Sequence, residues 1–390
     1  MSNGCGGAQD CGACGANEAC GAVVANRCGP LPCFNGVRDG PEGDVDCGGP
    51  CAALCAIGRL CNVTADCVGN ASCTMGVCTR GRAVALQAMP QGRGNAASVV
   101  VDGRLYVFGG LDSSLEPTTS TYIFDGTSWS GGAPFPEPRQ MATAVALAGG
   151  KIALVSGRGP SSTDHPDAGV RRRVDVYEPS SNSWSRLPDL PTSHVGACLV
   201  ARPNDELLVI GGYTGSDDDT QTRSVARWTP DAGQWVEVPD ALLVPRGGAT
   251  CGPTADGGVL LAGGLAAGFI YATDTAELLN PSSLTSVLLP RLPVRRGLST
   301  AGVLPDGRVL LLGGWDATST VTRSGAAMAE SWLWSERAPL GEAMTPLPAR
   351  LYGTASGLGP DGGLWLAGGV EKVTNLLFPR VSSVTTSWSY

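Results

Sequence analysis

Short apolar runs that end in a glycine pair recur along the chain after residue 91. They are LYVFGG at 105–110, LLVIGG at 207–212, VLLAGG at 259–264, VLLLGG at 309–314 and LWLAGG at 364–369, with a degenerate copy, IALVSG, at 152–157. Successive copies are 47 to 55 residues apart. A repeat period of about 50 residues is typical of architectures in which each repeat is one supersecondary unit.

A turn signal precedes each apolar run. The six pairs are Asp102-Gly103, Gly149-Gly150, Asn204-Asp205, Asp256-Gly257, Asp306-Gly307 and Asp361-Gly362. Such pairs accept positive φ angles and connect adjacent antiparallel strands. A further apolar segment lies before each turn, as at 97–101, 142–147 and 300–304. The pattern therefore predicts two strands of a hairpin in every repeat.

Aromatic residues predict two more strands in each repeat. Tyr177 and Trp184 are seven residues apart, with a Pro-Ser-Ser-Asn turn between them, and Trp228 and Trp235 have the same offset. We expect the tryptophan to open a fourth strand, and we assign Trp129, Trp334 and Trp388 to this place in other repeats. Four strands in about 50 residues correspond to one blade of a β-propeller.

This motif set resembles the kelch repeat, with its glycine pair after the second strand and its later tryptophan. Six copies cover residues 91–390. The resemblance implies an all-β fold, a six-bladed kelch-like propeller with four strands per blade. Because an open array would expose sheet edges, we expect the ring to close. We predict a propeller domain over 81–390, closed by an N-terminal strand near 83–89 that pairs with the C-terminal repeat.

A basic residue stands at a nearly constant distance before each glycine pair. The six are Arg93, Arg139, His194, Arg246, Arg296 and Arg350, at offsets of 16, 17, 17, 17, 17 and 18 residues before the first glycine, or before Ser156 in the degenerate copy. Symmetry places them in a ring at the channel mouth. They could bind an anion or an acidic peptide, since arginine suits carboxylates. Alternatively, each packs at a blade junction against a carbonyl or a carboxylate.

Cysteine divides the chain in two. Thirteen of the 15 cysteines lie in residues 1–80, a segment with no strand or helix period. We expect a small, mostly irregular domain stapled by disulfides, which implies an oxidising compartment. Zinc is the alternative, but only Cys11-x2-Cys14 forms a CxxC pair. Residues 33–78 resemble the Cys-rich repeats of secreted or surface proteins of myxobacteria and related bacteria, which implies an extracellular or outer-envelope location.

Two features of this head have open interpretations. Asp39, Glu42, Asp44 and Asp46 are a candidate calcium site or a solvated acidic turn. Thirteen cysteines leave one unpaired, and residues 1–5 lack the basic and apolar regions of a signal peptide. We expect either that the chain starts inside a longer product, with Cys5 as a lipid-anchor cysteine, or that one thiol stays free or pairs between molecules.

Composition narrows the functional classes. The formal net charge is −8, with no basic tail, which disfavours nucleic acid as a partner. No apolar run reaches the length of a transmembrane helix. The chain has only two histidines, His165 and His194. We find neither the Tyr, Cys and His set of the copper radical oxidases among kelch-type propellers nor sialidase-type repeats, and we expect Cys198 and Cys251 to be buried small apolar residues.

Taken together, the sequence predicts a non-enzymatic secreted or cell-surface protein. Its propeller would bind a protein or a glycan through its loops, with no cofactor and no catalytic residues. The alternative is an extracellular carbohydrate-active enzyme, a sugar isomerase or oxidase-like protein, that uses the propeller mouth. An enzyme should show acid and base groups converging in a concave site, whereas a binding protein should show an open face of loop residues.

Overall fold

The computed structural model describes residues 18–20, 28–30, 38, 42–51, 53–55, 59–67, 72–74, 77–79, 84–160, 169–215, 220–254, 256–266, 271–303, 308–316, 326–335, 338–344, 346–347, 349–360, 364–370 and 387–389. The chain divides into two compact units, residues 1–82 and 83–390. The calcium candidate Asp39 and the anchor candidate Cys5 lie outside the described residues.

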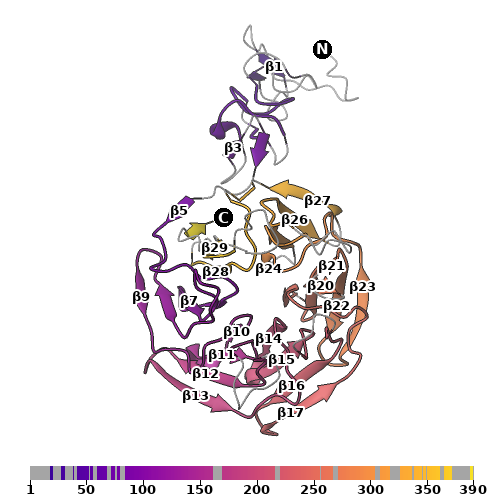
Figure 1. Ribbon diagram of the computed structural model, residues 1–390. Helices are drawn as coiled ribbons and strands as arrows, with labels where there is room; N and C mark the ends of the chain where they lie inside the picture. Colours follow the sequence, from indigo (N-terminus) through magenta and orange to yellow (C-terminus); the bar gives the residue numbers. More distant parts are fainter. Residues whose placement is uncertain are drawn as a thin grey trace. The chain divides into compact units, whose positions relative to one another are not determined.

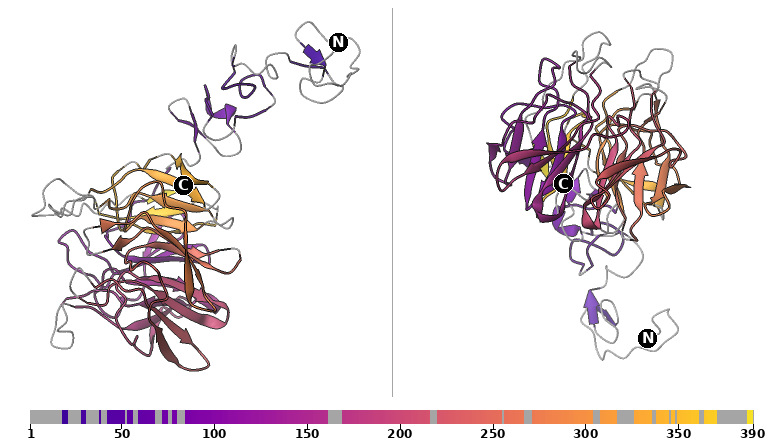
Figure 2. Two further views of the ribbon diagram at one scale, coloured as in Figure 1. Left: turned by 90° about the vertical axis from the view of Figure 1, so that its right-hand side faces the viewer. Right: turned by 90° about the horizontal axis from the view of Figure 1, so that it is seen from below.

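The second unit is built from antiparallel sheets, six of which have four strands. Figure 1 shows these sheets around a central axis, and Figure 2 shows them from two other sides. Along the chain, the first five are β6(Ala97–Val101)-β7(Arg104–Phe108)-β8(Thr121–Phe124)-β9(Trp129–Gly131), β10(Thr143–Ala146)-β11(Ile152–Val155)-β12(Val174–Glu178)-β13(Ser183–Leu187), β14(Cys198–Arg202)-β15(Glu206–Ile210)-β16(Val225–Thr229)-β17(Gln234–Val238), β18(Thr250–Pro253)-β19(Val259–Ala262)-β22(Ala276–Asn280)-β23(Thr285–Leu289) and β24(Thr300–Val303)-β25(Val309–Leu312)-β26(Ser331–Ser335)-β27(Ala338–Met344). We call them blades 1 to 5. The predicted all-β propeller is confirmed.

The sixth blade joins the two ends of this unit. Its strand order is β28(Ala355–Leu358)-β29(Leu364–Ala367)-β30(Ser387–Ser389)-β5(Val84–Leu86). The outermost strand, β5, comes from the start of the unit and pairs antiparallel with β30, with Leu86 opposite Ser387. Figure 1 shows β5 beside the C-terminus. A strand from one end therefore completes the sheet at the other end, which leaves no blade short of a strand.

The apolar runs form the second strand of each blade because this strand is buried on both faces. In β7, Tyr106 and Phe108 pack in the core between blades 1 and 2, whereas Leu105 and Val107 pack in the core between blades 6 and 1. Each of the six blade junctions has such a core. A continuous apolar run is the expected pattern for a strand with two buried faces.

The seven-residue aromatic offset is explained by cross-strand pairing. Tyr177 lies opposite Trp184, and Trp228 lies opposite Trp235, with ring centroids 4.9 and 5.5 Å apart. The assignment of Trp334 and Trp388 to fourth strands is wrong. Trp334 lies on β26 and Trp388 on β30, each the third strand of its blade. Trp334 pairs with Val309 and so takes the place of the first aromatic of the pair.

Short elements complete the propeller unit. The hairpin β20(Leu265–Ala266)-β21(Tyr271–Ala272) lies between the second and third strands of blade 4, and two 3-10 turns, η3(Ala148–Gly150) and η4(Pro203–Asp205), connect first and second strands. The turn residue Asn204 has a φ of 64°, as the predicted hairpin turns require. Among the described residues, no helix is long and apolar enough to cross a membrane.

The first unit has little regular structure. Its described residues contain two small hairpins, β1(Glu18–Cys20)-β2(Cys28–Pro30) and β3(Ser72–Thr74)-β4(Val77–Thr79), and the 3-10 turn η2(Thr64–Asp66). Disulfides join Cys47 to Cys55, Cys61 to Cys73 and Cys67 to Cys78. Their sulfur-bearing residues form the core of the unit. The predicted disulfide-stapled, mostly irregular region is confirmed.

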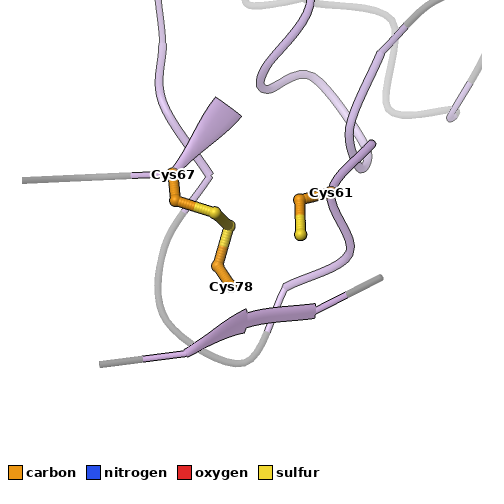
Figure 3. A group of neighbouring side chains, drawn as sticks. All are labelled: Cys61, Cys67 and Cys78. Atoms are coloured by element: carbon orange, nitrogen blue, oxygen red, sulfur yellow. A yellow bond between two sulfur atoms is a disulfide. The ribbon is translucent and has the colours of Figure 1, made fainter. Parts of the chain in front are cut away.

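One cluster in this unit bears on the zinc alternative. The sulfur atoms of Cys61, Cys67 and Cys78 lie within 4.8 Å of one another (Figure 3). Cys67 and Cys78 are bonded to each other, and Cys61 is bonded to Cys73. Zinc binds thiolates, and a sulfur in a disulfide is not one. The cluster is therefore part of the covalent framework.

Candidate functional site: the central cavity and its collar

Six backbone hydrogen bonds form a closed ring around the propeller axis. Its members, which we call the collar, are Asn95, Met141, Gly196, Gly248, Leu298 and Gly353, one from each blade. The N–H of Asn95 donates to the carbonyl oxygen of Gly353 at 2.8 Å, the N–H of Met141 donates to Asn95 at 2.8 Å, and so on around the ring to Gly353, which donates to Leu298 at 2.9 Å. The collar ties each blade to the next and uses no side chain.

All six collar residues have a left-handed backbone, with φ between 51° and 61°. Three are glycines, and asparagine accepts this conformation better than most residues, whereas Met141 and Leu298 adopt it at a cost. At Gly353 a side chain is also excluded by space, because a Cβ there would lie 2.0 Å from Asn95 Oδ1. Backbone strain of this kind persists only where the surroundings determine it, and here the cyclic bonding does so.

The collar surrounds a cavity of about 200 Å³ at the axis. All six blades contribute to its lining, through the collar and the residues that lead into the inner strands, among them Ala96, Ser98, Thr143, Ser299 and Thr354. The lining side chains are small or neutral. Two polar atoms, Asn95 Oδ1 and Thr354 Oγ1, are buried and accept or donate no hydrogen bond among the described residues.

Aromatic residues flank the collar on the side of the loops that follow the glycine pairs. Trp315 forms an isolated β-bridge with Gly297, and Tyr352 forms one with Val370. The two rings meet edge to face with centroids 5.2 Å apart. Burial raises the pKa of Tyr352 to about 12, so its hydroxyl stays protonated at neutral pH. A neutral cavity beside an aromatic pair suits a polar, uncharged ligand group.

The six basic residues lie next to the collar, but none of them lines the cavity. Five are buried, namely Arg93, Arg139, His194, Arg246 and Arg296, whereas Arg350 is exposed. Their side chains bind groups of their own blades. This geometry favours the structural interpretation of the basic register, and binding of an external anion by the ring stays a prediction.

The 17-residue offset marks one specific contact. Arg139, His194, Arg246 and Arg296 each donate to the carbonyl oxygen of the residue 17 positions later, at 2.9, 2.7, 2.7 and 3.1 Å. The two copies with other offsets differ. Arg93 donates instead to Gly92 O, Ser120 Oγ and Gln91 Oε1.

The glycine pair completes the junction from the neighbouring blade. In blade 4, the N–H of Gly264 donates to the carbonyl oxygen of Arg296 of blade 5 at 2.8 Å. A Cβ on Gly263 would lie 2.4 Å from that same oxygen, and the φ of Gly263 is 64°. The repeat needs glycine here because the backbone of the next blade approaches too closely for a side chain.

Carboxylates neutralise some of the buried cations. Arg139 Nη2 donates to Asp175, and Arg246 Nη2 donates to Glu277 at 2.5 Å, both pairs fully buried. Burial lowers the pKa of Arg139 to about 10, and Asp175 opposes the shift. The sequence held a signal for these partners that we did not use: each is a charged residue at the second position of the third strand, between apolar neighbours, as in VDVYE and AELLN.

In blade 3, a histidine and a glutamate take the places of the arginine and its carboxylate partner. His194 Nδ1 faces the carbonyl oxygen of Gly211, which can only accept, so Nδ1 carries a hydrogen. His194 Nε2 lies 3.1 Å from Glu237 Oε1. Burial alone would raise the pKa of Glu237, but the hydrogen bond and the charge of His194 lower it below the usual value. Glu237 lies on β17 opposite Ala226, the residue that occupies the place of Asp175.

Cys198 and Cys251 correct a prediction. They are not isolated apolar residues but form a disulfide between β14 and β18, the inner strands of blades 3 and 4, with Cα atoms 5.9 Å apart. No local pattern in the sequence indicates this bond, because the two cysteines are 53 residues apart and become neighbours only when the blades pack side by side.

Acidic side chains of the head accept hydrogen bonds from backbone N–H groups of the same unit. Asp44 accepts hydrogen bonds from the N–H groups of Val45 and Leu60, and these bonds lower its pKa. Glu42 is buried, and Asp46 has a positive φ of 55°. Asp66, which the sequence did not single out as a site, accepts from the N–H groups of Gly49, Asn62 and Val63. Calcium binding at Glu42, Asp44 and Asp46 stays a prediction.

Comparison with known proteins supports the repeat assignment. A family model described as "Kelch motif" matches residues 92–136. Beta-scruin of Limulus polyphemus is 28% identical over 151 residues, 38% of this chain and 16% of that protein. An N-acetylneuraminate epimerase of Brucella suis is 32% identical over 130 residues, 32% of each chain. The matched segments thus span a third or less of these relatives.

The fold has a counterpart among solved structures. The structure of YjhT aligns with a TM-score of 0.61 and 18% identity, over 78% of this chain and 95% of that one. At this identity the likeness concerns the fold alone. Together with the kelch-motif match and the repeated blades, it leads to one conclusion: the chain contains a kelch motif, folds as a β-propeller and has a disulfide-rich N-terminal region.

Proposed function

We propose that this protein is a non-enzymatic binding protein, secreted or displayed at the cell surface, whose propeller recognises a protein or glycan ligand. The observation that carries the proposal is the central cavity. It has neutral lining residues and an aromatic pair beside the collar, and two of its buried polar atoms, Asn95 Oδ1 and Thr354 Oγ1, make no hydrogen bond within the part of the chain that the structure describes. Such a site offers hydrogen bonds and apolar surface to hydroxyl or amide groups.

The disulfides support the proposed location. They occur in both units of the chain, at Cys47–Cys55, Cys61–Cys73 and Cys67–Cys78 in the head and at Cys198–Cys251 in the propeller. Structural disulfides persist in oxidising compartments and are rare in the cytosol. The head would then act as a covalently stabilised attachment region, and a lipid on Cys5 is one means of attachment.

A glycan or protein array probed with the full chain tests the proposal. We expect discrete ligands, and we expect Asn95→Gly to weaken their binding at least about tenfold, as loss of a hydrogen bond in a desolvated site does. Glycine keeps the left-handed backbone of Asn95 and removes only the amide. Asn204→Gly is the matched control, because Asn204 has a φ of 64° in an exposed turn away from the collar. Equal binding by both variants would place the site elsewhere.

The second candidate is a carbohydrate-active enzyme of the sugar-isomerase type. The identity to an N-acetylneuraminate epimerase favours it. Incubation of the full chain with N-acetylneuraminate, followed by proton NMR of the C3 methylene signals that distinguish its two anomers, tests it directly. Faster equilibration than in buffer, lost on heat denaturation of the protein, would establish the enzyme and overturn the non-enzymatic proposal.

A further inference from the structure

Blades 2, 4 and 5 contain three buried arginines at equivalent positions, Arg139, Arg246 and Arg296. Each donates Nη1 to the carbonyl oxygen 17 residues later. In each, Nε has no hydrogen-bond partner among the described residues. The three guanidinium groups therefore share their position and one contact, and they can be compared nitrogen by nitrogen.

The difference between them lies at Nη2. In blades 2 and 4 this nitrogen donates to a buried carboxylate, Asp175 or Glu277. In blade 5, Arg296 Nη2 has no partner among the described residues. Its contacts are backbone carbonyl oxygens, those of Leu311, Gly313 and Glu330, all bound by Nη1.

Strand register identifies the residue that replaces the carboxylate. Asp175 pairs with Leu154 and Glu277 with Leu261, each leucine two residues before the glycine position. The equivalent leucine in blade 5, Leu311, pairs with Trp332. Its indole Nε1 is also buried and also has no partner among the described residues. In blades 2 and 4, the arginine Nη2 therefore donates to a carboxylate on the third strand. In blade 5, both the arginine Nη2 and the third-strand indole are N–H donors, and neither has a partner among the described residues.

Glu330 is the carboxylate that acts on Arg296: its charge opposes the fall in the pKa of Arg296, but among the described residues Arg296 Nη2 makes no hydrogen bond to it. In blade 3, which also lacks a carboxylate on the third strand, Glu237 provides one from the opposite strand position. The corresponding position in blade 5 is Ala343, opposite Trp332. Burial lowers the pKa of Arg296 to about 10, which still leaves the group charged at neutral pH. A buried guanidinium nitrogen that makes no hydrogen bond is costly, so an exogenous anion that accepts from it would be bound favourably.

We propose that Arg296 and Trp332 form a binding site for a small monovalent anion, a halide ion or the carboxylate of a small molecule, in blade 5. Arg296 Nη2 and Trp332 Nε1 donate to it, and it takes the part that Asp175 and Glu277 play in blades 2 and 4. The site is separate from the central cavity, because neither residue lines that cavity. It would stabilise the blade irrespective of what the propeller binds.

Thermal unfolding of the full chain in an anion series tests the proposal. Chloride, bromide and acetate are titrated separately at constant ionic strength with sulfate as the balancing anion. We expect the unfolding temperature to rise with the logarithm of the concentration of at least one monovalent anion, as binding to the native state alone requires. A response to halides alone identifies an ion site, and a response to acetate alone identifies a carboxylate site.

Two variants separate specific binding from general salt effects. Trp332→Glu restores a carboxylate at the position of Glu277 and is expected to abolish the anion dependence. Glu277→Gln creates a second unpaired arginine in blade 4 and is expected to steepen it. An unchanged slope in Trp332→Glu would overturn the proposal, and so would a flat slope in the unaltered protein.

Crystals grown in sodium bromide give a direct readout. We expect an anomalous bromine peak within hydrogen-bond distance of Arg296 Nη2 if the site takes halides. For an acetate-specific site, we expect planar density of acetate size at the same place in crystals grown in acetate. A water molecule there in both crystals would show that hydration, and not an anion, satisfies the arginine.

Discussion

The propeller and the cysteine-rich head are stabilised by different kinds of interaction. The propeller buries a strand on both faces in each blade and closes its backbone through the collar, so its stability derives from apolar cores and hydrogen bonds. The core of the head consists of cysteines, and the strands among its described residues form short hairpins. A segment that cannot bury enough apolar surface needs covalent crosslinks, because they reduce the entropy of the unfolded chain.

Both units also use charged side chains to satisfy backbone groups, with opposite sign. In the propeller, buried arginines donate to carbonyl oxygens at the blade junctions, as Arg246 does to Gly263. In the head, Asp66 accepts from three N–H groups. The difference reflects which backbone groups lack a backbone partner. At the blade junctions these are carbonyl oxygens at strand ends, whereas in the tight turns of the head they are N–H groups.

Breaking a buried ion pair of the propeller should have the largest effect on stability. We expect Asp175→Asn to lower the free energy of unfolding by about 3–5 kcal/mol, because it removes the hydrogen-bonded counterion of the buried Arg139. Chemical denaturation followed by tryptophan fluorescence measures this. Arg350→Ala is the control, since Arg350 is exposed, and we expect a change within about 0.5 kcal/mol. Similar values for the two variants would contradict the assigned role of the buried register.

Removing the disulfide between blades should have the next largest effect. We expect the double variant Cys198→Ser, Cys251→Ser to lose about 2–4 kcal/mol of propeller stability while keeping its fold. Chemical denaturation of the oxidised variant and the parent protein measures the loss. If the variant failed to fold at all, closure of the propeller would depend on this covalent bond and not on the collar, and the contrast with the head would disappear.

Acid should produce the smallest of these changes, and Asp66 of the head is a site where it can be followed residue by residue. Hydrogen bonds from Gly49, Val63 and Asn62 lower the pKa of Asp66 below 3.8. A carboxylate whose pKa is lower in the folded state stabilises that state above pH 3.8, and the stabilisation is lost as the pH falls through the folded-state pKa. We expect the amide proton shifts of those three residues to titrate together below pH 3.8 in NMR spectra. Independent titrations, or none, would count against Asp66 as their shared acceptor.

Local periodicity made much of the fold predictable from the sequence. The strand predicted at 97–101 coincides with β6, and the glycine pairs have the expected positive φ. Four of the turn signals lie between the first and second strands of their blades, whereas Asp306-Gly307 and Asp361-Gly362 lie outside the described residues. The roles of the basic residues were not predictable, because their partners are distant: Asp175 is 36 residues from Arg139. Trp334 was misplaced because blade 5 has an aromatic at the first position of the pair and none at the second, a choice that only cross-strand register reveals.

Hydrogen–deuterium exchange of the full chain, followed by mass spectrometry with and without reductant, tests the contrast between the two units most directly. Without reductant, we expect slow exchange at the collar amides and in the disulfide-bonded part of the head. With reductant, the head should lose its protection, whereas the collar amides of Asn95, Met141, Gly196, Gly248, Leu298 and Gly353 should stay protected. Loss of collar protection together with that of the head would contradict a propeller closed by its own backbone.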